Sequence, residues 1–145
     1  DRLPGQQLAR LNLRILASDI APHALSKATE AVYATKDLKP VPGDLRQAWT
    51  KEEGEETRIG DVPRSLVRFR SLNLLGTWPI SGKFDVIFCR NVMIYFDNST
   101  KEQLVQRFVD VLAPGGTLYI GHSERVSGPA ADHLQLIGPT IYRRR

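Results

Sequence analysis

The chain has 145 residues, a length that suits one domain, and its 20 Lys and Arg against 16 Asp and Glu give a formal net charge of +4 at pH 7. Three of the positive charges are the terminal Arg143, Arg144 and Arg145, so the remaining surface is nearly neutral and a nucleic-acid-binding function is disfavoured. No apolar run approaches the roughly 20 residues of a membrane-spanning helix, and we expect a cytoplasmic protein with no signal peptide and no direct membrane insertion.

The chain begins with a predicted strand and a predicted helix. Residues 13–17 read Leu-Arg-Ile-Leu-Ala, which predicts a strand that ends at Ser18 and Asp19. Pro22 suits the first turn of the helix that follows. Three apolar residues recur on one face of this helix: Leu25, Ala28 and Val32.

Residues 36–63 interrupt this pattern, because they contain several Pro and Gly residues and a Glu-rich run. We interpret them as an insertion with a short helix near residues 45–49 and a small hairpin that has residues 57–59 in one arm. Residues 66–69 then resume as a strand, and residues 73–76 turn the chain.

Residues 84–89 predict a buried strand, because Val86 to Cys89 form an apolar run. Arg90 and Asn91 follow this run directly. In an open α/β sheet, ligands bind at the carboxyl edge of the strands. The position of these two polar residues therefore indicates a binding site as well as a core strand.

The remaining chain predicts a helix, a strand and a hairpin. Ser99 and Glu102 match a capping box at the start of the helix, which the Pro and Gly residues at 114–116 end. Its apolar residues fall at helical spacing: Leu104, Phe108, Val111 and Leu112. Residues 117–120 predict a short strand, and residues 134–143 predict a final hairpin.

This order of elements predicts an α/β fold. We expect an incomplete doubly wound, Rossmann-like domain with a mainly parallel sheet, a small inserted subdomain at 36–63 and a C-terminal antiparallel hairpin. In such a sheet, Asp19, Asn73 and Arg90 each follow or close a strand. We therefore expect these three residues at one edge of the sheet.

Four motifs occur in order along the chain. They are Ile-Leu-Ala-Ser-Asp-Ile at 15–20, Ser-Leu-Asn-Leu-Leu at 71–75, Phe-Cys-Arg-Asn-Val-Met-Ile-Tyr-Phe-Asp at 88–97 and Leu-Ala-Pro-Gly-Gly-Thr-Leu-Tyr-Ile-Gly-His-Ser-Glu at 112–124. Together they resemble the chemotaxis receptor methyltransferases, the CheR family, over nearly the whole chain. The resemblance implies a methyltransferase domain over residues 1–145 that uses S-adenosylmethionine, releases S-adenosylhomocysteine and esterifies glutamates on the cytoplasmic domain of chemotaxis receptors.

One part of the family pattern has no counterpart upstream of Leu13. The family's cofactor domain begins with a strand and a loop that contains a Gly-Glu-Glu-Pro-Tyr-Ser-like segment, and a small helical domain precedes it. The missing strand normally lies between the strands predicted at 13–17 and 84–89, which leaves two hydrophobic edges. We therefore expect a truncated chain, either a fragment, a split gene product or a swapped oligomer, that self-associates or swaps elements.

Asp19, Asn73 and Leu74 are the predicted adenosine-binding residues. A carboxylate at the end of a strand accepts two ribose hydroxyl groups in dinucleotide folds, and the resemblance assigns this role to Asp19. The alternative is an acidic residue favoured by the start of the next helix. Asn73 and Leu74 suit adenine through a side-chain amide and a backbone N–H, and the alternative for Asn73 is an ordinary turn asparagine.

Arg90, Asn91 and Tyr95 form the predicted reaction site, with Tyr95 and Arg90 as catalytic residues and Arg90 and Asn91 as cofactor-binding residues. A glutamate with a pKa of about 4.3 is ionised at neutral pH, so methyl transfer needs alignment and a water-poor pocket but no general base. Arginine holds a carboxylate bidentately, and a tyrosine hydroxyl orients either reactant. In the family, this tyrosine and a nearby arginine lie near the transferred methyl group; a structural role is the alternative for Arg90.

Other residue types that often carry chemistry have simpler explanations. Cys89 lies within a strand and, as the single cysteine, forms no intramolecular disulfide, so we expect a core residue. His122, Ser123 and Glu124 are sequential neighbours, which argues against a catalytic triad, and we expect them at the rim of the pocket. The histidines have no partner at metal-ligand spacing, and no metal site is expected.

Two functions stay open. The first is an S-adenosylmethionine-dependent protein-glutamate O-methyltransferase with chemotaxis receptors as its partners, which the motif residues favour. The second is a non-catalytic recognition or assembly module with the C-terminal half of the fold, which the missing cofactor loop favours for the isolated chain. The insertion at 36–63 corresponds to a subdomain that binds a receptor tail by strand addition in some family members, and a charged linker is its alternative.

Overall fold

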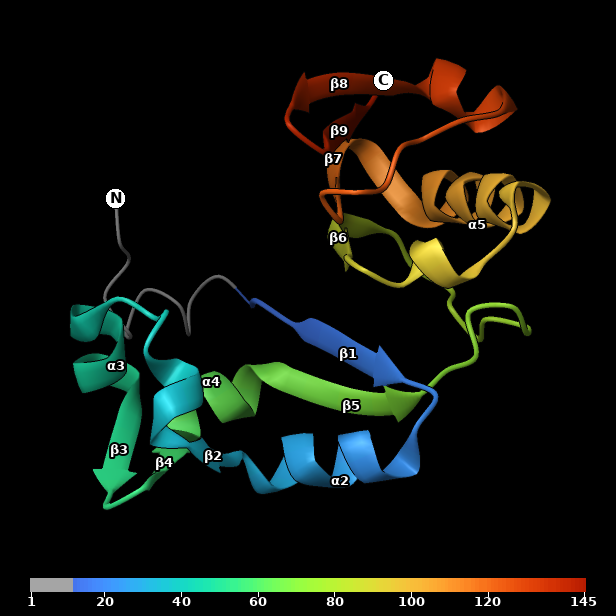
Figure 1. Ribbon diagram of the computed structural model, residues 1–145. Helices are drawn as coiled ribbons and strands as arrows, with labels where there is room; N and C mark the ends of the chain where they lie inside the picture. The colour runs from blue at the N-terminus through green and yellow to red at the C-terminus, as the bar shows by residue number, and fades with distance from the viewer. Residues whose placement is uncertain (1–11) are drawn as a thin grey trace. The chain divides into compact units, whose positions relative to one another are not determined.

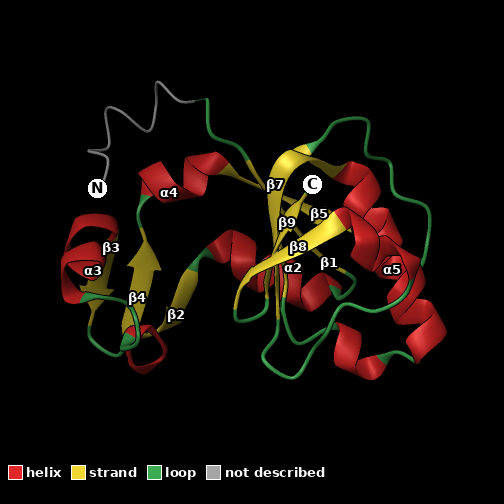
Figure 2. Cartoon of the chain, turned by 90° about the horizontal axis from the view of Figure 1, so that it is seen from above, coloured by secondary structure: helices red, strands yellow, loops and turns green. Residues whose placement is uncertain are grey.

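The computed structural model describes residues 12–145, and the chain divides into two compact units (Figure 1). The first unit ends at Gly76, and the second runs from Thr77 to Arg145. Each unit has its own sheets and helices. In Figure 2, helices are red and strands are yellow. Among the described residues, no helix is long and apolar enough to cross a membrane.

The first unit contains a two-stranded parallel sheet. Strand β1 (Ile15–Asp19) pairs with β5 (Val67–Ser71), and the register places Asp19 opposite Ser71. Both strands were predicted from their apolar residues, with ends that differ by up to two residues. Because the strands are parallel, their carboxyl ends meet at the same edge of this sheet.

Helix α2 (Pro22–Glu30) follows β1 and packs along β5 (Figure 1). Its first turn contains the proline, as predicted. The helix ends at Glu30, and its C-cap Ala31 adopts a left-handed conformation with a φ of 56°. Val32 lies beyond this point in a strand, so the prediction that it belongs to the helix is wrong.

The insertion folds around a three-stranded antiparallel sheet with the order β2-β4-β3. It extends beyond the predicted bounds of 36–63, and its elements follow one another along the chain: β2 (Val32–Ala34), η1 (Thr35–Leu38), α3 (Gly43–Trp49), β3 (Thr50–Glu53), β4 (Glu56–Ile59) and α4 (Asp61–Leu66). The predicted short helix and hairpin are α3 and the β3–β4 pair, which turns at Gly54 with a φ of 68°. This segment is therefore a folded subdomain, not a charged linker.

The second unit contains one long helix and a four-stranded sheet with the order β6-β7-β9-β8. Its elements are β6 (Phe84–Cys89), η2 (Met93–Tyr95), α5 (Asn98–Val111), β7 (Leu112–Ile120), η3 (Pro129–His133), β8 (Leu134–Gly138) and β9 (Ile141–Arg144). Strands β6 and β7 are parallel, and the β8–β9 hairpin adds antiparallel to β7, as predicted. Side chains of α5 and of the sheet form the apolar core: Leu104, Val105, Phe108, Val109, Leu112, Leu118 and Ile120.

Both ends of α5 differ from the prediction. The N-cap is Asp97, whose Oδ1 accepts a hydrogen bond from the Thr100 N–H at 2.8 Å. This bond, which favours the charged carboxylate, holds the pKa of Asp97 below its usual value. The predicted capping box of Ser99 and Glu102 is therefore wrong. Leu112 has extended backbone and opens β7, so its prediction as a helical residue is also wrong.

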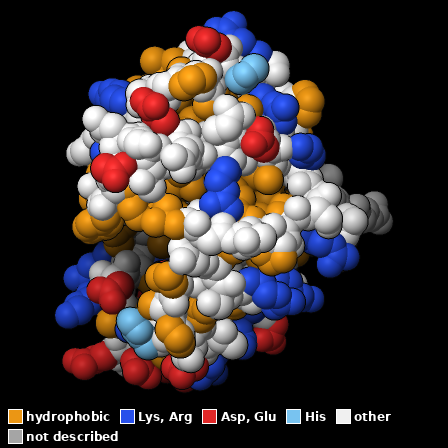
Figure 3. Space-filling model, turned by 90° about the vertical axis from the view of Figure 1, so that its right-hand side faces the viewer, with side chains coloured by type: hydrophobic (Ala, Val, Ile, Leu, Met, Phe, Trp, Pro, Cys, Tyr) orange, Lys and Arg blue, Asp and Glu red, His pale blue; other side chains and the backbone are white. Residues whose placement is uncertain are grey.

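The parallel pairs β1–β5 and β6–β7, the inserted subdomain and the antiparallel hairpin together match the predicted α/β fold class. Within residues 12–145, β1 and β6 each pair with one strand. Both carry exposed apolar side chains: Ile15, Leu16, Val86 and Phe88. The prediction that residues 84–89 form a buried strand is therefore wrong for Val86 and Phe88, because they lie on a strand that pairs on one side alone among the described residues. On the face shown in Figure 3, hydrophobic side chains lie among basic and acidic ones.

We predict that Leu118→Ala destabilises the protein by about 2–5 kcal/mol, because this side chain is fully buried on β7 and its loss leaves a cavity. Leu136→Ala is the matched control, since this leucine is 61% exposed on β8 of the same unit and its loss should change stability by less than about 0.5 kcal/mol. Urea unfolding followed by circular dichroism measures both. Equal losses would contradict the described core.

Candidate functional site

The loops that follow β1 and β5 lie at one edge of the first unit. Asp19 is opposite Ser71 in the parallel register, and the Leu72 N–H donates to the Asp19 carbonyl oxygen at 3.0 Å. The loop that carries Asn73 and Leu74 begins at this point. The predicted adenosine-binding residues are thus brought together within this unit, at the carboxyl ends of two parallel strands.

Asp19 has an exposed side chain that already makes one local contact. Its Oδ1 accepts a hydrogen bond from the Ala21 N–H at 2.8 Å, just before α2 begins at Pro22. This bond fits the alternative in which the residue serves the start of the helix. The bond also fixes the orientation of the carboxylate group. The other oxygen, Oδ2, takes no part in that bond.

Asn73 is the first residue of a turn. Its Oδ1 accepts a hydrogen bond from the Leu75 N–H at 2.9 Å, and its carbonyl oxygen accepts one from the Gly76 N–H at 3.0 Å. These are the contacts of the ordinary turn asparagine that was the alternative. The side-chain NH2 group takes no part in either bond, and the side chain is exposed at the surface of the loop.

The segment after β6 carries the other predicted residues, in the second unit. Arg90 and Asn91 are exposed, and Asn91 has a φ of 60°, a left-handed conformation that asparagine tolerates better than most residues. The chain then forms the short 3-10 turn η2, in which Met93 is 1% exposed and Tyr95 is 80% exposed. The buried methionine anchors the turn and leaves the tyrosine ring at the surface.

Glu124 organises this segment, which the sequence did not predict. Its side chain is 4% exposed, and the expectation that it lies at a pocket rim is wrong. Oε1 accepts hydrogen bonds from the N–H groups of Val92 at 3.2 Å and Ile94 at 3.3 Å. Oε2 accepts hydrogen bonds from the N–H groups of Asn91, at 3.3 Å, and Gly121.

Gly121 is needed for this approach. A Cβ atom there would lie 2.5 Å from Asn91 Oδ1 and 2.8 Å from Glu124 Oε2, closer than atoms in contact can be. The residue follows β7 directly, and the backbone N–H of Glu124 donates to its carbonyl oxygen at 3.0 Å. The absence of a side chain therefore lets the end of β7 meet the segment that follows β6.

The predicted site residues belong to two units. Asp19, Asn73 and Leu74 lie in the first, and Arg90, Asn91 and Tyr95 lie in the second. The gathering of Asp19, Asn73 and Arg90 at one edge stays a prediction. The described residues hold no group of three His, Cys, Asp or Glu side chains that could bind a metal ion.

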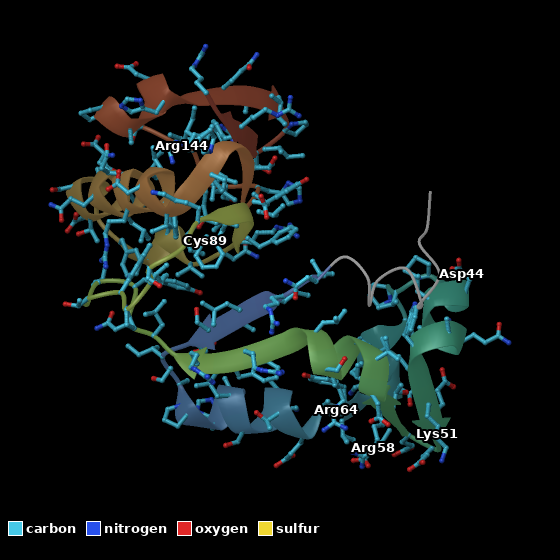
Figure 4. The ribbon with its side chains drawn as sticks, turned by 180° about the vertical axis from the view of Figure 1, so that it is seen from behind. Asp44, Lys51, Arg58, Arg64, Cys89 and Arg144 are labelled. Carbon is cyan, nitrogen blue, oxygen red and sulfur yellow. The ribbon has the colours of Figure 1, made fainter. Side chains whose placement is uncertain are left out.

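Cys89 ends β6 and is 6% exposed; it is labelled in Figure 4. Burial raises the pKa of its thiol to about 12, and the negative charge of Glu124 adds to this effect. A thiol that stays protonated at neutral pH is a poor nucleophile. The position agrees with the expectation of a core residue.

The sequence was compared with protein families and with curated relatives. The family model described as "CheR methyltransferase, SAM binding domain" matches residues 4–142. A probable chemotaxis protein methyltransferase of Rhizobium etli is 44% identical over 140 residues, which cover 94% of this chain and 52% of that protein. The chemotaxis protein methyltransferase of Escherichia coli is 39% identical and covers 89% of this chain and 46% of its own length.

A third relative, chemotaxis protein methyltransferase 2 of Pseudomonas aeruginosa, is 40% identical over 90% of this chain and 48% of its own length. The chain thus spans about half the length of the curated relatives it matches. Among solved structures, the N-methyltransferase NodS from Bradyrhizobium japonicum has a TM-score of 0.52 and 16% sequence identity, and the match covers 90% of this chain and 73% of that one. This likeness supports the methyltransferase-type α/β fold.

We predict that Cys89 makes the protein less stable as the pH rises from 8 to 10. The unfolded chain releases the thiol proton near pH 8.5, whereas the folded protein keeps it until about pH 12. Above pH 8.5 the unfolded state therefore binds fewer protons, and the free energy of unfolding should fall by about 1–2 kcal/mol over this interval.

Urea unfolding at pH 8 and pH 10 measures this loss. Cys89→Ala is the control, because it removes the titrating thiol and leaves every other ionisable group in place. The variant should lose less stability than the wild type over the same interval. An identical pH dependence in the two proteins would contradict the raised pKa.

Proposed function

Since the chain belongs to the CheR methyltransferase family, whose SAM binding domain it matches over residues 4–142, we propose that the protein transfers methyl groups from S-adenosylmethionine to glutamate side chains of chemotaxis receptors. The observation that carries the proposal is this match, together with relatives that are chemotaxis methyltransferases. The polar residues that follow β1, β5 and β6 suit the cofactor and the reaction. The proposed reaction is the formation of a methyl ester.

The residues that would hold the adenosine are Asp19, Asn73 and Leu74. The Asp19 carboxylate would accept hydrogen bonds from the ribose hydroxyl groups, and its bond from the Ala21 N–H would keep it aimed at them. Asn73 would use its side-chain amide toward the polar edge of adenine, from a turn that its own Oδ1 stabilises. The chemistry of this donor and acceptor set fits an adenosine.

The residues that would serve the transfer are Arg90, Asn91 and Tyr95. When bound, the cofactor would supply a methyl group on a positively charged sulfur, which a glutamate oxygen would accept while the electron pair of the broken carbon–sulfur bond stays on sulfur. Arg90 would orient the incoming carboxylate, and the Tyr95 hydroxyl would align either reactant. Asn91 would contact the cofactor. No residue needs to remove a proton, because the glutamate is already ionised at neutral pH.

The inserted subdomain is the proposed contact for the receptor outside the reaction site. Within residues 12–145, β2 and β3 are the edge strands of its three-stranded sheet, and such an edge accepts an extended peptide as an added strand. Lys51 on β3 and Arg58 on β4 are labelled in Figure 4. We propose that this subdomain binds a tail segment of the receptor.

Asp19→Asn should weaken cofactor binding at least tenfold. The asparagine keeps an oxygen for the Ala21 N–H, but it replaces the second carboxylate oxygen by an NH2 group that accepts no hydroxyl hydrogen bond. A loss on the order of 1.5 kcal/mol or more corresponds to that factor. Calorimetric titration of the full-length protein with S-adenosylhomocysteine measures it.

Asp61→Asn is the matched control, since that carboxylate belongs to the same unit and its side chain is fully exposed. It should bind the cofactor product like the wild type. An unchanged affinity in Asp19→Asn would remove Asp19 from the cofactor site. No binding by the wild type would favour a non-catalytic module instead.

Tyr95→Phe should lower the rate of methyl transfer by about tenfold or more, while the affinity for S-adenosylhomocysteine changes by less than about threefold. The variant removes the hydroxyl and keeps an 80% exposed ring, so folding is not affected. Transfer of tritiated methyl groups to a receptor cytoplasmic fragment, released by base as methanol, measures the rate. Tyr119→Phe is the control that should keep full activity. The Tyr119 ring stacks on the Phe88 ring, with 4.6 Å between the ring centroids.

A further inference from the structure

The Glu124 carboxylate joins two chain segments of the second unit. Three of its N–H donors belong to residues 91–94, after β6, and the fourth belongs to Gly121, at the end of β7. Two donors reach each oxygen. The side chain comes from a position 30 to 33 residues further along the chain than the donors after β6, so the contact depends on the tertiary fold.

The backbone after β6 depends on this acceptor. Asn91 has a left-handed conformation and Val92 has a φ of −113° and a ψ of −46°, so these residues continue neither a strand nor an α-helix. Backbone N–H groups inside a protein need acceptors. A carboxylate supplies stronger hydrogen bonds than a neutral oxygen, and here it supplies both of its oxygens.

Glu124 is placed to act through other residues. At 4% exposure it is buried, and both of its oxygens accept backbone hydrogen bonds, whereas Tyr95 is 80% exposed. The segment that it holds begins at Asn91 and leads through the buried Met93 to that tyrosine. A change of the carboxylate would therefore change the orientation of the exposed side chains of Asn91 and Tyr95.

We propose that Glu124 is the positioning residue of the transfer site, in that its carboxylate fixes the backbone of residues 91–94 and thereby aligns Asn91 and Tyr95 for methyl transfer. This inference rests on the proposed function. Gly121 is part of the same device, because a side chain there would displace Asn91 and the carboxylate together. The device is independent of the adenosine-binding residues, which belong to the other unit.

Glu124→Gln tests the proposal in the full-length protein. Glutamine has the same shape, but one carboxylate oxygen becomes an NH2 group that faces backbone donors. The kcat of methyl transfer should fall at least about tenfold, while the affinity for S-adenosylhomocysteine changes less than about threefold. In NMR spectra, the amide signals of Asn91, Val92 and Ile94 should move.

Gly121→Ala is the second variant, because it keeps every acceptor but crowds Asn91 and Glu124. It should lower kcat in the same way, and it decides the matter if Glu124→Gln does not fold. Glu30→Gln is the control, since that glutamate is exposed at the last position of α2, outside the residues proposed to bind the cofactor or the receptor, and should leave kcat unchanged. Assays are made well below the unfolding temperature of each variant, so that a loss of folded protein does not lower the rate.

Two failures are distinguishable. A wild-type protein that binds no S-adenosylhomocysteine and transfers no methyl group overturns the proposed function and this inference with it. A wild-type protein that transfers methyl groups, with folded Glu124→Gln and Gly121→Ala variants that match its kcat, overturns the positioning role alone. A loss of kcat in step with an equal loss of cofactor affinity also overturns it, because a general structural role would produce that pattern.

Discussion

One buried carboxylate holds the ends of two parallel strands together in the second unit. The segment after β6 has little regular hydrogen bonding of its own, and Glu124 gives its N–H groups both of its oxygens. Gly121 supplies the space for this approach. The segment that contains these donors also carries the buried Met93 and the exposed Tyr95, so its backbone links the core of the unit to its surface.

The fold was predictable where the sequence signal is local and strong. The apolar run at 86–89 indicates a strand and residues 134–143 indicate a hairpin, and the structure has both, although the predicted burial of β6 fails at Val86 and Phe88. The start of α5 was not predictable, because residues 97–100 read Asp-Asn-Ser-Thr and all four types cap helices well. The prediction that Leu112 is helical was wrong for a similar reason, since an apolar residue at that position suits both the core face of a helix and a buried strand.

In the candidate site too, the sequence indicated some residues and missed another. Arg90 and Asn91 drew attention because polar residues follow an apolar strand directly; both are exposed, and their role in a site stays a prediction. Glu124 gave no such signal, since the burial of a carboxylate depends on N–H groups that only the tertiary fold brings to it. Asp19 and Asn73 make the local turn contacts of their simpler alternatives, and their role in cofactor binding stays a prediction.

A crystal structure of the full-length protein with S-adenosylhomocysteine tests the central claim most directly, that the Glu124 carboxylate fixes the segment after β6, which carries Asn91 and Tyr95. We expect the ribose hydroxyl groups within hydrogen-bond distance of the Asp19 carboxylate and the adenine beside Asn73. Glu124 should remain bonded to the backbone N–H groups of that segment. A cofactor bound away from Asp19, or a Glu124 side chain turned to solvent, would contradict the account.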